Sequence, residues 1–130
     1  MNLYLSAAGT LAFLVGLVHS ALGELLIFRR MRVKGLVPTN GGKLIGEGHV
    51  RILWASWHLV TVLGWLVAVV LLSMAAQPLQ TPAHGFLLRA VVVATLCGSL
   101  LVFVGTRARH PGWVGLLGVA VLTWLGRGAS

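Results

Sequence analysis

The chain has 130 residues, of which 58% are hydrophobic and only 9% charged, and its mean hydropathy is +0.95. A soluble domain of this length needs far more charge to cover its surface, so we expect a single domain, residues 1–130, embedded in a lipid bilayer. The lone cysteine, Cys97, excludes an internal disulfide and a cysteine-rich zinc or iron–sulfur site. The net charge is +8, and most of the basic residues lie between apolar runs. This pattern is typical of a membrane protein and not of a nucleic-acid-binding protein.

Four apolar segments predict an all-α integral membrane bundle of four transmembrane helices, with spans at about 3–28, 51–74, 85–105 and 112–127. At about 1.5 Å per residue, the first three can cross a hydrocarbon core of about 30 Å. The fourth is shorter and crosses only with little tilt. We interpret the first run as a retained span and not a signal peptide, because basic residues follow it and none precedes it.

The loops between these spans differ in charge. The connection 29–51 carries six basic residues and 106–112 carries Arg107 and Arg109, whereas 77–84 carries no Lys or Arg. The positive-inside rule therefore places both basic loops in the cytoplasm and both termini outside, in a multi-pass protein of the cell inner membrane. Within the first loop, Asn40-Gly41-Gly42 predicts a turn, and the stretch GGKLIGEGH is typical of a hinge or a binding loop.

The first span combines small and polar residues on one face. In helical projection, His19, Ser20 and Glu24 fall within an arc of about 140° that also contains three glycines at intervals of seven, Gly9, Gly16 and Gly23. The opposite face is smooth and apolar. We expect the small face to form a groove that admits a neighbouring backbone or a flat ligand.

The second span has a matching stripe, in which six residues step by three and four: Glu47, Arg51, Trp54, His58, Thr61 and Trp65. His19 lies nine residues before the inner end of the first span and His58 seven residues after the inner end of the second. These intervals correspond to about 14 Å and about 11 Å of depth. The sequence therefore predicts a site of His19, Glu24 and His58 in the cytoplasmic half of the membrane, with His49 or Arg51 at its mouth.

Two hypotheses give this site a cofactor. In the first, His19 and His58 ligate a b-type haem, Gly16 and Gly23 admit the porphyrin, Trp54 flanks it, and Arg51 meets the propionates. In the second, a single transition metal (zinc, iron or copper) binds to His19, His58 and Glu24, with His49 as a further ligand. Two acidic residues in the whole chain are too few for a carboxylate-bridged pair of metals.

Two further hypotheses need no cofactor. In the first of them, Glu24 and the histidines titrate and couple proton movement to the passage of a solute. About 130 residues, four spans and a membrane-embedded glutamate on the first helix give a plan similar to that of the small multidrug resistance transporters, although the later-helix motifs of that family are not found. Alternatively, the chain is an accessory or assembly subunit whose polar groups fix helix register, in a homo-oligomer or with a membrane protein partner. The sequence predicts no nucleophile–base–acid arrangement, and hence no enzyme.

Overall fold

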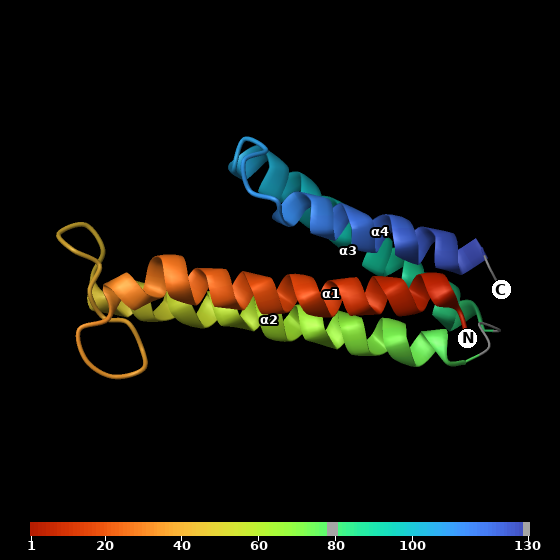
Figure 1. The fold of residues 1–130 in the computed structure, drawn as a ribbon, viewed down its shortest axis with the longest axis horizontal. Coiled ribbons are helices and arrows are strands. Elements are labelled where there is room, and N and C mark those ends of the chain that lie inside the picture. Colours follow the sequence, from red (N-terminus) through yellow and green to blue (C-terminus); the bar gives the residue numbers. More distant parts are fainter. Residues whose placement is uncertain (78–80, 129–130) are drawn as a thin grey trace. The chain divides into compact units, whose positions relative to one another are not determined.

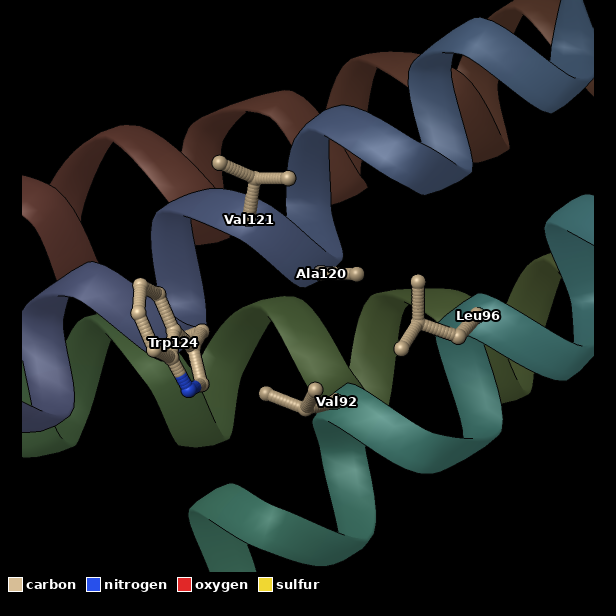
Figure 2. A pocket seen from close by; sticks show the side chains of 5 residues that line it. All are labelled: Val92, Leu96, Ala120, Val121 and Trp124. Carbon is tan, nitrogen blue, oxygen red and sulfur yellow. The ribbon is translucent and has the colours of Figure 1, made fainter.

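In a computed structural model of the chain, residues 1–77 and 81–128 are described, and they form four α-helices (Figure 1). Helix α1 spans Leu3–Leu22 and continues through a π-helical turn, Gly23–Ile27, and a 3-10 turn, Phe28–Met31. The other helices are α2 (Glu47–Ala75), α3 (Pro82–Gly105) and α4 (Gly112–Gly128).

Three of these helical segments are long and apolar enough to cross a membrane: Leu3–Met31, Glu47–Ala75 and Pro82–Gly105. At most 28% of the most hydrophobic window of any of them is buried inside the protein, so their apolar side chains are available to lipid. These helices indicate a membrane protein in contact with a bilayer. Helix α4 is shorter, with 17 residues.

The helical ends depart from the predicted spans by a few residues. The second helix begins at Glu47 and not at Arg51, so the whole stripe from Glu47 to Trp65 is helical. The third begins at Pro82, where the missing N–H of proline costs nothing and Thr81 caps the helix by accepting a hydrogen bond from the His84 N–H. Part of the predicted uncharged loop 77–84, residues 78–80, lies outside the described residues.

The chain divides into two compact units, which we call the core unit (Met1–Val15 and Gly64–Ser130) and the hairpin unit (Gly16–Leu63). The core unit is held by apolar side chains from all four helices. Leu5, Leu71 and Leu88 are almost fully buried there. Ser99 of α3 adds a hydrogen bond to the backbone oxygen of Trp113 in α4, at 2.7 Å, which joins these two helices through a polar contact.

Glycines on α4 allow α1 to approach it closely within the core unit. A Cβ on Gly115 would lie 2.7 Å from Val15, one on Gly118 would lie 2.9 Å from Leu11, and one on Gly126 would lie 2.7 Å from Leu5. Because real Cβ contacts are longer than this, the side chains of α1 occupy the space that these glycines leave. This is the small-residue packing that apolar helices use where no hydrophobic effect drives them together.

The hairpin unit contains the candidate site. The end of α1, with its π and 3-10 turns, lies beside the start of α2, and residues 32–46 connect them. Phe28 and Val50 are buried at this end, and Pro38 of the connecting loop is buried as well. The polar residues predicted as a site therefore lie within one structural unit, on α1, its π turn and α2.

Candidate functional site

Glu24 lies in the π turn and has three partners from different parts of the hairpin unit. Its Oε1 forms an ion pair with the guanidinium of Arg32, which belongs to the connecting loop. Its Oε2 accepts a hydrogen bond from the indole N–H of Trp54, at 3.3 Å, and lies 3.5 Å from Nε2 of His58. The Glu24 side chain is only 28% exposed, so these partners replace most of the water that a carboxylate would otherwise bind.

His58 joins the carboxylate to a hydroxyl. Its Nδ1 lies 2.5 Å from the hydroxyl oxygen of Ser20, in hydrogen-bond contact, while its Nε2 faces Glu24. The His58 and Trp54 rings meet in a T-shaped contact, with ring centres 5.0 Å apart and planes at 68°, and the Phe28 ring lies 6.1 Å from that of His58. Ser20, His58 and Glu24 thus form a hydroxyl–imidazole–carboxylate chain, which we call the Ser–His–Glu chain.

His19 is placed by Trp57. Its ring stacks on the indole with centres 4.4 Å apart and planes only 7° from parallel. The Trp57 N–H also donates to the His19 backbone oxygen, at 3.0 Å. Trp57 therefore contacts both the side chain and the backbone of His19. That the imidazoles of His19 and His58 belong to one shared site stays a prediction.

Gly23 makes room for the indole that holds His19. A Cβ at Gly23 would lie 2.0 Å from Nε1 of Trp57 and within 2.7 Å of two further indole atoms, a clash with a rigid ring. The π turn begins at this glycine and carries Glu24. Single π turns within helices are rare and occur frequently at functional sites, because the extra residue redirects a side chain. The other two glycines predicted to line the groove, Gly9 and Gly16, are buried.

For the two residues predicted at the mouth of the site, the described contacts are not with Glu24, and their place at the mouth stays a prediction. Arg51 pairs with Glu47, one helical turn before it, through bonds of 2.7 and 2.9 Å. His49 is exposed in the first turn of α2. The cation beside Glu24 is instead Arg32, because the chain folds back after the 3-10 turn and returns the guanidinium to the carboxylate.

The described residues hold no group of three or more His, Cys, Asp or Glu side chains placed to bind a metal ion. Two potential ligands, Glu24 and His58, do come together, but both ring nitrogens of His58 already face protein groups. The cluster is chemically suited to exchanging a proton, since an imidazole between a hydroxyl and a carboxylate can be held in either protonation state.

The sequence pattern missed three members of the site: Ser20, Arg32 and Trp57. Ser20 lies on the same polar arc as His19, so helical projection could have placed it in the site. Trp57 was harder to predict, because only its position directly before His58 pointed to it. Arg32 carried none, because the direction of a guanidinium in an irregular loop has no periodicity from which it can be predicted.

Comparisons with models of protein families, with curated proteins and with solved structures find no match. The functional assignment therefore rests on the geometry of the site and on the chemistry of its residues.

Replacing Gly23 by Ala tests how closely Trp57 packs at the π turn. We expect Gly23→Ala to lower the melting temperature in detergent and to shift the tryptophan emission, because the added Cβ must displace the indole from His19. Overpacking of this kind costs about 1–3 kcal/mol. The matched control is Gly64→Ala on α2, where a Cβ meets nothing within 4 Å. Equal melting temperatures and spectra for the two variants would contradict the packing described here.

Proposed function

We propose that the protein is a small proton-coupled membrane carrier, in which the pair of His58 and Glu24 binds and releases one proton as a small solute passes. This is one of the functions that the sequence left open. It gives a role to each polar contact of the site: Glu24 supplies the negative charge, His58 carries the proton, and Arg32 balances the carboxylate.

The observation that carries this proposal is the position of the His58 ring between Ser20 and Glu24. In neutral His58, Nε2–H faces the carboxylate and Nδ1 accepts the Ser20 hydroxyl proton. In protonated His58, both nitrogens donate, and the Ser20 oxygen accepts in turn. The hydroxyl can reverse its role, so the same contacts accommodate both states without rearrangement of the helices.

The same contacts make the cofactor hypotheses less favoured. A haem iron or a transition metal would bind one nitrogen of His58, whose Nδ1 contacts Ser20 and whose Nε2, 3.5 Å from Glu24, forms no hydrogen bond. Among the described residues, no third His, Cys, Asp or Glu side chain is placed beside this pair to complete a metal site. Two measurements on one sample distinguish the possible cofactors. Haem b absorbs visible light, and elemental analysis detects zinc, iron or copper.

A second candidate function is that of an accessory or assembly subunit. It is favoured by the contacts of Glu24, since an ion pair with Arg32, a hydrogen bond from the Trp54 indole and the nearby His58 ring are suited to a purely structural lock between α1 and α2. In that case the site holds the register of the two helices and moves no proton during function. The two proposals differ in whether Glu24 is needed for flux.

We further propose that all four helices cross the inner membrane, with both termini outside. Support comes from the eight basic residues in loops 29–51 and 106–112, against Arg127 in the last turn of α4 and Arg89 near the start of α3. Helix α4, at about 1.5 Å per residue, is about 25 Å long, so it fits a core of about 30 Å only where the bilayer is locally thinner.

The protonation of His58 is testable through the tryptophan beside it. We expect a proton bound at His58 to quench tryptophan emission as the pH is lowered, because an imidazolium whose ring centre lies 5.0 Å from that of Trp54 withdraws its excited-state electron. His58→Gln and the reporter variant Trp54→Phe should both lose this step, and His49→Gln should keep it. A step unchanged in His58→Gln would refute the assignment.

An absorption spectrum and elemental analysis of the same sample decide between bound haem, bound metal and neither.

Coupled flux is tested in liposomes with an entrapped pH dye. We expect at least one solute from a panel of small cationic, zwitterionic and neutral compounds to drive proton release, and Glu24→Gln to abolish it because the paired charge is lost. Glu47→Gln removes the other acidic residue of the chain and serves as the matched control, since Glu47 is exposed and pairs only along α2. Flux that survives Glu24→Gln, or folded protein without flux for the whole panel, would favour the accessory function.

The orientation is tested with single cysteines in a Cys97→Ser background. A membrane-impermeant maleimide should label Gln77→Cys in intact cells, because loop 77–84 is proposed to lie outside. It should label Gly42→Cys only after the membrane is permeabilised. Labelling of Gly42→Cys in intact cells would reverse the topology, and labelling of both positions would exclude a single orientation.

A further inference from the structure

The loop between α1 and α2 folds into two closed lobes. The first, Met31–Thr39, is closed by hydrogen bonds from the backbone N–H groups of Thr39 and Asn40 to the Met31 oxygen, at 3.1 and 2.9 Å. The second, Gly41–Ile45, is closed by a β-bridge between its ends. In Figure 1 the lobes spread to either side of the paired ends of α1 and α2 instead of continuing along the helix axes.

Both lobes present the same chemistry at their tips. The first tip reads Lys34-Gly35-Leu36 and the second reads Gly42-Lys43-Leu44. Each glycine has a positive φ, of 82° and 70°, which allows the sharp turn that pushes its neighbours outward. Leu36 is 74% exposed and Leu44 is 95% exposed. Each lobe thus displays one lysine beside one leucine that the fold leaves unburied.

The charges around the lobes are of one sign. No acidic residue occurs between Glu24 and Glu47. Those two glutamates are already paired, with Arg32 and Arg51 respectively, so neither offsets the remaining cations. The exposed cations of this segment are Arg29, Arg30, Lys34 and Lys43.

We propose that the two lobes dock on the anionic headgroups of the membrane that the helices cross. The lysines would meet lipid phosphates, and Leu36 and Leu44 would enter the boundary between headgroups and acyl chains. A positively charged segment beside a membrane-spanning helix is attracted to anionic lipid, and exposed apolar side chains gain from leaving water. The lobes extend to the sides of the paired ends of α1 and α2, and the proposal places their tips over lipid.

Anionic lipid fits the tips better than a nucleic acid or an acidic protein. Both of those would match the cations but would leave two leucines in water. A lipid headgroup layer offers phosphate and hydrocarbon within a few ångströms of each other, which is the combination that each tip presents. The proposal is independent of the function proposed for the Ser–His–Glu chain.

The test measures the surroundings of the lobe tips in lipid nanodiscs. An environment-sensitive fluorophore is attached to Leu36→Cys or Leu44→Cys in a Cys97→Ser background. We expect bluer emission and protection from aqueous iodide in nanodiscs that contain phosphatidylglycerol, relative to phosphatidylcholine alone. Each lysine near an anionic surface contributes about fivefold to the docking equilibrium, so Lys34→Gln with Lys43→Gln should require much more phosphatidylglycerol for half-maximal protection. High salt should act in the same direction.

The matched control removes two charges elsewhere. Arg107→Gln with Arg109→Gln alters the other basic loop and should leave the protection of the lobe tips unchanged. Equal protection in both lipids, or an equal effect of the two double variants, would overturn the proposal. So would protection by inorganic phosphate in phosphatidylcholine nanodiscs, which would indicate a free anion as the ligand. Protection seen in native vesicles but not with phosphatidylglycerol would indicate a protein partner and would also overturn it.

Discussion

The carboxylate of Glu24 is the constraint on which the hairpin unit depends. A charge in an apolar helix costs a few kcal/mol unless the protein supplies its partners. Here the partners come from two other segments: Arg32 from the loop, and Trp54 and His58 from α2. The contacts of the Glu24 carboxylate therefore fix the register of α1 against α2, and they hold the loop after Met31 close to the end of α1. Loss of any of these partners would leave a buried polar group, so the three contacts support one another.

The π turn is the local solution that makes this possible. It inserts an extra residue into the helical repeat at Gly23–Ile27, directs Glu24 toward its partners and leaves Phe28 packed against Trp57 and His58. Gly23 is required because the Trp57 indole occupies the place of a Cβ. In turn, Trp57 stacks on His19 and binds its backbone oxygen. The two tryptophans thus have distinct roles, since Trp54 contacts the charged pair while Trp57 positions the helix that carries it.

The sequence was sufficient for much of this architecture and for the core of the site. Long apolar runs predicted the three long helices, because twenty or so apolar residues have few alternatives to a membrane-spanning helix. A fourth helix was also predicted, at about 112–127, and the structure has it at Gly112–Gly128, whereas its crossing of the membrane stays a prediction. Periodicity predicted that Glu24 and His58 lie together, as they do, although it could not predict the π turn at Gly23–Ile27, through which a constant 100° per residue does not hold. Arg51 was predicted at the site and Arg32 was not, since loop geometry decides which cation reaches Glu24.

Arg32 connects the site to the lobes. Its Nη1 pairs with Glu24, and its Nε donates to the backbone oxygen of Leu36 at 2.6 Å, at the tip of the first lobe. A guanidinium has donors on separate nitrogens, so it can hold a carboxylate and a carbonyl at once. Any movement of the Leu36 backbone therefore acts on the guanidinium that pairs with Glu24. His58 faces the same carboxylate, so two side chains, Arg32 and Glu24, connect the first lobe to His58.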